Sequence, residues 1–191
     1  MAKGNGTTKT VSTNSLSASR NSGSVGAKMK SDAFIEKHPR WNKIYKKIED
    51  ILNEINENGH TLSEKIFSIG DVDKDVSKYA ELNGIIIGSK TDFLDTKQIF
   101  HTQRKAHKQK GIYIGDEALK TFPQKRYSMH VFFDEDKKNF VYADGKNKYI
   151  IEPNTSPKRF KEKGDISVYI TGLKLKQGMS EFNMKKYKKI R

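Results

Sequence analysis

The chain has 191 residues, which suits one domain of ordinary size or a smaller domain with a long tail. Its 37 Lys and Arg residues outnumber its 23 Asp and Glu residues, and the formal net charge of +14 favours polyanionic partners, nucleic acid first and an anionic membrane second. The absence of cysteine excludes disulfides, thiolate metal sites and a cysteine nucleophile, and no apolar run approaches the length of a membrane span, about 20 residues.

Residues 1–31 are rich in Ser, Thr, Gly, Asn and Lys, and Asp32 is the first acidic residue. This segment has no apolar periodicity, so burial cannot offset the entropy that ordering would cost. We therefore expect a disordered basic tail. The composition also overlaps with that of an organellar transit peptide, a packaging tag or a phosphate-binding arm, although the many Gly and Asn residues disfavour the amphipathic helix of a transit peptide.

Residues 39–57 show the clearest helical pattern, with apolar side chains on one face at i, i+3, i+4 and i+7 spacing. Pro39 suits the first turn of a helix, and Gly59 suits its C-terminal stop. An apolar stripe of this length needs a partner surface, which is either the main domain or a second copy of the helix. The segment 32–62 is therefore expected to be an amphipathic helix that precedes the main domain.

Short elements of both kinds are predicted between residues 66 and 123. Apolar runs rich in β-branched residues indicate strands, and helical spacing with a cap residue and a terminal Gly or Pro indicates helices. The expected elements are a strand at 66–70, a helix at 75–84, a buried strand at 85–88, a helix from Asp95 or Thr96 to Gly111, and a helix at 115–123 that Pro123 ends.

After residue 123 the hydrophobic period changes from helical to two, which indicates strands. Tight turns join most of these strands, and short links between neighbours imply antiparallel pairing. The predicted fold class is α+β, with N-terminal helices followed by a four-stranded antiparallel β-meander and helices packed on one face. The strands are expected at 128–134, 139–144, 148–153 and 165–175, within an α+β domain at 63–176 that a basic tail at 177–191 follows.

The stretch IFHTQRKAHKQKG, residues 99–111, places two histidines among several cations in one predicted helix. Positions three, four and seven apart lie on one side of a helix, so one ridge should carry a histidine flanked by cations. No carboxylate lies between Asp95 and Asp116, so these charges lack a local partner and an external counterion is expected. The ridge consists of Lys97, His101, Arg104, Lys105 and Lys108.

Three interpretations of this ridge stay open. It is a solvated helix face, a phosphate-binding surface formed by Arg104, Lys105 and Lys108, or a catalytic surface with His101 as the proton-transfer group. A histidine whose pKa lies near its ordinary value of about 6.5 exchanges protons at neutral pH. Adjacent cations would lower that pKa and favour a neutral base.

Neither a metal site nor a nucleotide cofactor is indicated. His101 and His107 lie six residues apart, unlike the i, i+4 pair of a helical zinc site, and no HExxH is present. No Walker A, Rossmann, GxSxG or kinase motif is present either. His130 alternates within a predicted strand, where it is an exposed strand residue or a second catalytic imidazole.

A second polar cluster, EPNTSPKRF, follows a predicted strand at residues 152–160. Pro153 and Pro157 stiffen this segment. Its hydroxyl, amide and cationic groups can donate hydrogen bonds to a phosphate. The segment is either a phosphate site or an ordinary surface loop. Its polar side chains are those of Asn154, Thr155, Ser156, Lys158 and Arg159.

Two segments carry a resemblance to a known family. One is FLDTKQIFHTQRKAH, a predicted helix bearing H-x-x-R, and the other is HVFFDEDKKNFVYADGKNKYIIEPN, predicted strands and turns that end in K-Y-I-I-x-P-N. Over roughly residues 64–175 the chain resembles the phage-borne branch of the barnase–EndoU–colicin–RelE nuclease superfamily, the PBECR-type domains. The opening MAKGNGTTKT is also similar to openings of proteins from phages and mobile elements.

The resemblance implies a metal-independent endoribonuclease, in which the RNA 2′-oxygen attacks its own phosphate. By position, His101 would be the acid or base and Arg104 the phosphate clamp. Asn154 and Thr155 would approach from the loop after the third strand of the meander. The second proton-transfer group would be His130 or Glu152, and the nucleic-acid contacts would be Lys97, Lys105, Lys108, Lys158 and Arg159.

Three classes of function therefore stay open. They are an endoribonuclease of the toxin or phage-effector type, a noncatalytic nucleic-acid-binding accessory of a phage or mobile element, and a structural or interaction protein that docks through the 39–57 helix. The expected partner is nucleic acid, above all RNA, and then an immunity protein or a phage structural protein. No cofactor, metal or membrane is expected, and the oligomeric state is left open. The lack of an apolar signal region predicts the cytoplasm of a bacterial host, or packaging in a virion.

Overall fold

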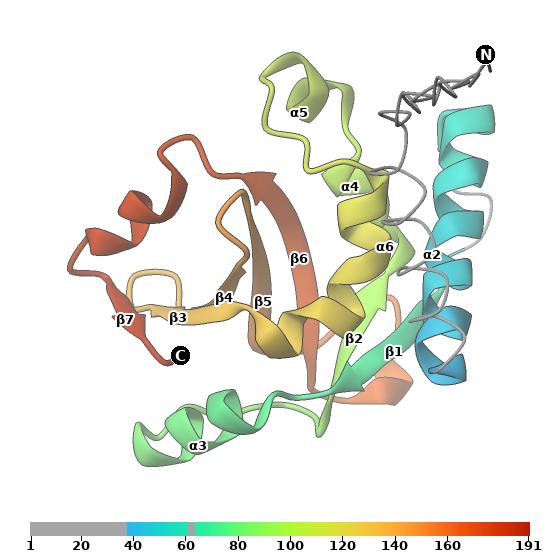
Figure 1. Ribbon diagram of the computed structural model, residues 1–191. Coiled ribbons are helices and arrows are strands. Elements are labelled where there is room, and N and C mark those ends of the chain that lie inside the picture. The colour runs from blue at the N-terminus through green and yellow to red at the C-terminus, as the bar shows by residue number, and fades with distance from the viewer. Residues whose placement is uncertain (1–37, 61–63) are drawn as a thin grey trace, which may run out of the picture. The chain divides into compact units, whose positions relative to one another are not determined.

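The computed structural model describes residues 38–60 and 64–191, and the tail expected at 1–31 lies outside them. One mixed sheet forms the centre of this part, in the order β1-β2-β6-β5-β4-β3-β7 (Figure 1). The α+β class is confirmed, but the sheet has seven strands, not the four that the sequence predicts. The strands are β1 (Ile66–Asp71), β2 (Thr91–Asp95), β3 (His130–Asp134), β4 (Asn139–Ala143), β5 (Asn147–Thr155), β6 (Ile166–Lys174) and β7 (Tyr187–Lys189).

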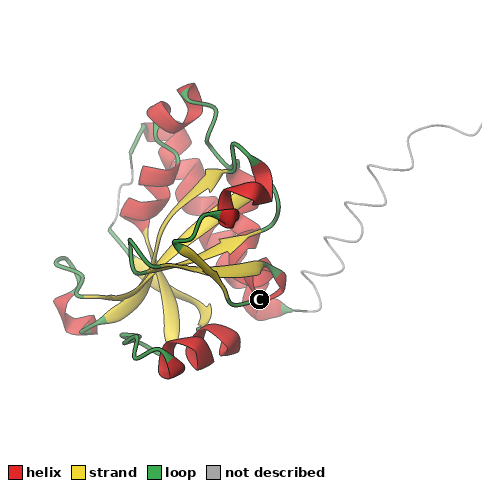
Figure 2. Cartoon of the chain, turned by 90° about the vertical axis from the view of Figure 1, so that its left-hand side faces the viewer, coloured by secondary structure: helices red, strands yellow, loops and turns green. Residues whose placement is uncertain are grey.

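Strands β3, β4, β5 and β6 are neighbours in the sheet and pair antiparallel in chain order. The sheet is mixed because β2 pairs parallel with β6 on their outer side, and β1 then pairs antiparallel with β2. Figure 2 shows the strands fanning out around one another, as the twist of a large sheet requires. Because β2 and β5 both pair with β6, the loop after β5 lies beside the end of β2, although the two are distant in sequence.

Most helices share one core with one face of the sheet. Helix α2 buries the apolar stripe that its sequence predicts, including Ile48 and Leu52, and ends at Gly59, whose φ of 73° is left-handed. It packs against α6 and α4, so the partner surface of its stripe lies within the chain. The helices are α2 (Pro39–Asn58), α3 (Lys74–Leu82), α4 (Thr96–Thr102), α5 (Lys105–Gln109) and α6 (Asp116–Lys125).

The C-terminal residues 177–191 are part of the fold, so the expected basic tail is wrong. Helix η3 (Gly178–Asn183) covers the other face of the sheet, where Phe182 stacks on Phe132 with ring centroids 4.2 Å apart. Strand β7 then pairs with β3. Arg191 Nη1 lies 2.9 Å from a carboxylate oxygen of Asp73. The segment is rich in cations and has few apolar residues, so its sequence alone does not predict this packing. Its order depends on pairing with β3, which is distant in sequence.

The run 85–88 is a loop, not the buried strand that its β-branched sequence predicts. Ile86 is 72% exposed, and the Gly88 N–H donates one backbone hydrogen bond to Pro153 O at 2.8 Å. The strand of this region is β2, which buries Leu94 and also the charged side chain of Asp92. A charged residue does not usually indicate a buried strand, because a buried carboxylate needs a partner, and the partner of Asp92 is not visible in the local sequence.

The helix expected at 96–110 is two helices. Asp95 caps α4 as predicted, since its carboxylate accepts a hydrogen bond from Lys97 N at 2.8 Å. The helix breaks at Arg104, whose ψ of 140° is extended, while the Gln103 amide donates to Asp116 Oδ1 at 2.8 Å. The predicted ridge from Lys97 to Lys108 is therefore divided between two elements that point in different directions (Figure 1).

Helix α6 continues to Lys125, two residues beyond the stop predicted at Pro123. The missing N–H of a proline removes one helical hydrogen bond and its ring crowds the preceding turn, which usually ends a helix. Here Pro123 and its neighbour Phe122 are both buried. Burial in the core therefore outweighs the local cost of the proline.

Candidate functional site

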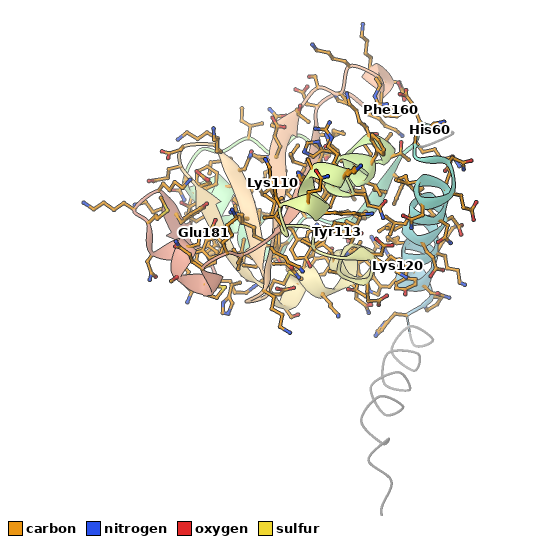
Figure 3. The ribbon with its side chains drawn as sticks, turned by 90° about the horizontal axis from the view of Figure 1, so that it is seen from above. His60, Lys110, Tyr113, Lys120, Phe160 and Glu181 are labelled. Atoms are coloured by element: carbon orange, nitrogen blue, oxygen red, sulfur yellow. The ribbon has the colours of Figure 1, made fainter. Side chains whose placement is uncertain are left out.

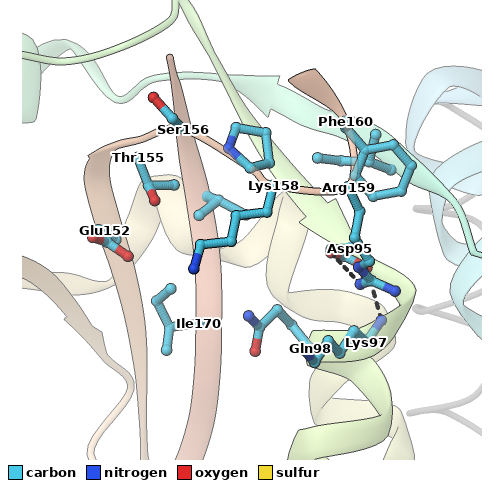
Figure 4. Close-up of a pocket in the computed structure, with 13 residues that line it drawn as sticks. Asp95, Lys97, Gln98, Glu152, Thr155, Ser156, Lys158, Arg159, Phe160 and Ile170 are labelled. Carbon is cyan, nitrogen blue, oxygen red and sulfur yellow. Dashed lines mark hydrogen bonds and ion pairs between the residues drawn. The ribbon is translucent and has the colours of Figure 1, made fainter. Parts of the chain in front are cut away.

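A pocket of about 300 Å³ lies between the sheet and the loop that follows β5, and we call it the Glu152 pocket (Figure 4). Its floor is formed by Val168 and Ile170 of β6, on the face opposite the main core. Lys97 and Gln98, in the first turn of α4, form one wall. The opposite side is contributed by β5 and its loop, with Glu152, Thr155, Ser156, Lys158, Arg159 and Phe160.

Arg159 holds the loop over the sheet. Its guanidinium donates to Asp95 Oδ1 at 2.8 Å and to Asp95 Oδ2 at 2.7 Å, and it also pairs with Glu64. A bidentate arginine–carboxylate pair fixes orientation as well as distance. Arg159, a predicted nucleic-acid contact, therefore already has two carboxylate partners, and its position explains how residues distant in sequence form one pocket.

Three charged side chains of the pocket have no such partners. Within the described residues, the side chains of Glu152, Lys97 and Lys158 make no hydrogen bond or ion pair. Lys158 extends from the loop into the space between Thr155 and Glu152 on one side and Gln98 on the other (Figure 4). A carboxylate can accept a proton, and two ammonium groups with a hydroxyl can bind a phosphate. The pocket thus combines the two kinds of group that phosphodiester chemistry needs.

His101 lies one helical turn from this wall. It is four residues after Lys97 and three after Gln98 on α4, so the three side chains share a side of the helix. Burial lowers the pKa of His101 below its ordinary value of 6.5, and the charges of Arg104 and His107 lower it further. The two imidazole rings meet edge to face with centroids 5.2 Å apart. His101 is therefore neutral at neutral pH and able to accept a proton.

We expect the variant Arg104→Gln to raise the pKa of His101, because it removes a repulsive charge. The pKa should still lie below 6.5, since burial is the larger cause. An NMR titration of the imidazole resonances measures this directly. The exposed Lys125→Gln is the matched control and should leave the value unchanged. An equal response to both variants, or a fall in the pKa with Arg104→Gln, would contradict this electrostatic account.

Neither His101 nor the remaining predicted site residues line the pocket. Arg104, Lys105 and Lys108 lie at or within α5, beyond the helix break. His130 is exposed on β3 and pairs with Ala143, two strand spacings from β5, which is about 10 Å. Asn154 faces the 85–88 loop, because a Cβ atom on Gly88 would lie 2.6 Å from its Oδ1.

Part of the pocket is predictable from the sequence. Thr155, Lys158, Arg159 and Lys97 are predicted site residues that line it, and Glu152 is a predicted proton-transfer candidate. Gln98 and the anchoring role of Asp95 are not predicted. The helical cap explained Asp95 fully at the local level, so nothing in the sequence pointed to its second contact with Arg159.

Comparisons with known proteins find no matching family model, no similar curated protein and no similar solved structure. Across residues 38–60 and 64–191, no group of three or more His, Asp or Glu side chains is placed to hold a metal ion. No helix in the same part of the chain is both long and apolar enough to cross a membrane.

Proposed function

We propose that the chain binds RNA and cleaves it as a metal-independent endoribonuclease, with the Glu152 pocket as the cleavage centre. The observation that carries this proposal is that the pocket holds the carboxylate of Glu152 together with the ammonium groups of Lys158 and Lys97, none of which is paired with another described residue (Figure 4). The net charge of +14 supports a polyanionic substrate. A neutral His101 on the wall helix supplies a second group that can exchange a proton.

The proposed reaction is an internal transesterification. The ribose 2′-oxygen bonds to the adjacent phosphorus while the bond from phosphorus to the 5′-oxygen breaks, which leaves a 2′,3′-cyclic phosphate and a 5′-hydroxyl end. Glu152 takes the 2′ proton, and the ammonium of Lys158 gives a proton to the departing 5′-oxygen. Lys97 and the Thr155 hydroxyl stabilise the charge that develops on the phosphorane. His101 is the alternative acceptor of the 2′ proton.

The variant Glu152→Gln is expected to lower the cleavage rate by about 10²- to 10⁴-fold, the usual contribution of a positioned general base. The amide keeps the size of the side chain but accepts no proton. The assay is cleavage of labelled single-stranded RNA in EDTA, with the 2′,3′-cyclic phosphate end identified by mass spectrometry. Glu162→Gln, an exposed carboxylate on the same loop, should retain the full rate.

The pH profile separates the two candidate acceptors. If His101 accepts the proton, the rate falls as pH drops through its lowered pKa, His101→Ala is slow, and Glu152→Gln retains most of the rate. If Glu152 accepts it, His101→Ala retains most of the rate. Intact RNA at high concentrations of the unmodified protein, together with a salt-dependent mobility shift, would overturn the nuclease proposal. That result would favour a noncatalytic nucleic-acid-binding protein.

A further inference from the structure

The segment around α5, residues 103–112, projects from the body of the protein beyond the end of α4, and we call it the basic lobe (Figure 1). Helix α5 has no buried residue, so its sequence contributes nothing to the core. Figure 3 labels Lys110 on this lobe and Tyr113 just after it. Because α5 buries no residue, core packing does not account for the many cations of this segment.

The basic lobe nevertheless has a specified conformation. His107 Nδ1 donates to Thr102 O at 3.0 Å, and the Ile112 N–H donates to His107 O at 3.0 Å. Lys108 Nζ lies 5.2 Å from the centre of the Tyr113 ring. The Lys174 N–H of β6 donates to Ile112 O at 2.9 Å, which fixes the base of the lobe to the sheet. The cations are therefore presented on an ordered support.

The charges of the basic lobe have no acidic partner. Arg104, Lys105 and Lys110 are exposed and form no ion pair within the described residues. The nearest acid in the sequence, Asp116, already accepts from Gln103 and from the hydroxyl of Tyr113. Lys174, exposed at the base of the lobe, adds a further cation that has no ion-pair partner in the part of the chain that the structure describes. A surface with this charge excess is complementary to a polyanion.

Helix α4 connects the basic lobe to the Glu152 pocket. Its first turn carries Lys97 in the pocket wall, and the lobe begins after its last residue, Thr102. At about 1.5 Å per residue, the helix spans about 9 Å, so the lobe lies a few nucleotides from the pocket along a bound strand. An RNA strand that is bound in the pocket and extends along α4 would therefore bring its next phosphates to the lobe.

We propose that the basic lobe is a second binding site for the phosphate backbone of single-stranded RNA, which makes the protein select long strands over short ones. This inference rests on the proposed function, because the pocket supplies the point from which the strand extends. Its partner is recognised by backbone charge alone, since the lobe presents cations and no exposed aromatic platform for a base. The lobe is a binding element and takes no part in the chemical step.

The test uses a triple variant, K105Q/K110Q/K174Q, whose three side chains are exposed and form no ion pair with any described residue. The control variant, K43Q/K46Q/K78Q, removes the same charge from α2 and α3. Binding is measured by fluorescence anisotropy with a labelled 2′-O-methyl 24-mer, which cannot be cleaved because it has no free 2′-hydroxyl. The slope of log affinity against log salt concentration is determined for each protein, and a 2′-O-methyl 2-mer, too short to reach from the pocket to the lobe, serves as the short strand.

We expect the lobe variant to lose about 2 units of slope with the 24-mer, near 0.7 for each phosphate contact removed, and about tenfold or more in affinity near physiological salt. The control variant should lose much less, and both variants should bind the 2-mer as the unmodified protein does. Equal losses in the two variants, or none in either, would overturn the lobe as a site. Cleavage of a short RNA by the lobe variant is measured separately, so a failure of the nuclease proposal is distinguished from a failure of this one.

Discussion

Replacing Arg126 by Met should lower the free energy of unfolding by about 3–5 kcal/mol, the usual cost of breaking a buried ion pair on one side. The side chain of Arg126 is fully buried and pairs with the carboxylate of Asp92, which is also buried. Its other donors reach Asp71 O at 2.7 Å and Pro123 O at 3.2 Å. The variant therefore leaves a buried carboxylate without its cation and removes a donor from the carbonyl groups of Pro123 and Asp71.

The surrounding contacts prevent this site from adapting. Asp92 Oδ1 accepts from the Ser167 hydroxyl at 2.5 Å, which holds the carboxylate in place on β2. A double variant, Arg126→Met with Asp92→Leu, should be more stable than the single variant, because it leaves no uncompensated charge in the core. Urea unfolding followed by circular dichroism gives the three free energies. Lys125→Met, an exposed neighbour, is the control and should change stability by less than about 0.5 kcal/mol.

A single-variant loss below 1 kcal/mol would show that water or a rearranged side chain reaches Asp92. A double variant less stable than the single one would show that Asp92 is not destabilising when Arg126 is absent. Either result would contradict the account of Arg126 as the centre of the buried network.

The variant Phe122→Ala should cost about 3–5 kcal/mol, as large-to-small changes of buried aromatic residues do. Phe122 is 1% exposed and lies where α6 meets three tyrosines of the sheet. Its ring stacks on Tyr149 with centroids 4.3 Å apart and planes 11° apart, and it meets Tyr142 edge to face. Because Tyr169 also contacts it, the change leaves a cavity that rigid rings surround and cannot fill.

Thermal unfolding and urea unfolding both measure the loss for Phe122→Ala. Phe122→Leu should cost less than half as much, because it keeps most of the volume and all of the apolar character. Phe160→Ala, on the loop of the Glu152 pocket, is a matched control for a half-buried phenylalanine and should cost much less. A similar loss for all three variants would mean that the stacked rings around Phe122 have no special part in the core.

Local patterns predicted much of this fold. The apolar stripe of α2 and the left-handed Gly59 follow from spacing and from glycine's conformational freedom, and Asp95 caps α4 as a short acceptor side chain should. The period-two segments after residue 123 are strands in the structure. In each case the residues that specify the element are close in sequence, so their pattern is visible without a partner.

The failures share one physical cause. Strand β2 was missed because a buried Asp92 is tolerated only beside Arg126, which is 34 residues away. The break between α4 and α5 depends on the hydrogen bond from Gln103 to Asp116, and the order of residues 177–191 depends on pairing with β3. Each of these long-range partners overrides a local preference of the chain.

The candidate site also combines features that the local sequence predicts with features that only long-range contacts determine. Composition and charge by themselves indicate a basic protein without cysteine, and the loop sequence indicates hydroxyls and cations that suit phosphate. The pairing of Arg159 with Asp95, 64 residues apart, then folds that loop over β6 and places Lys158 between Glu152 and the first turn of α4. Residue types are properties of the sequence, but their meeting in one pocket requires the sheet to bring Asp95 and Arg159 together.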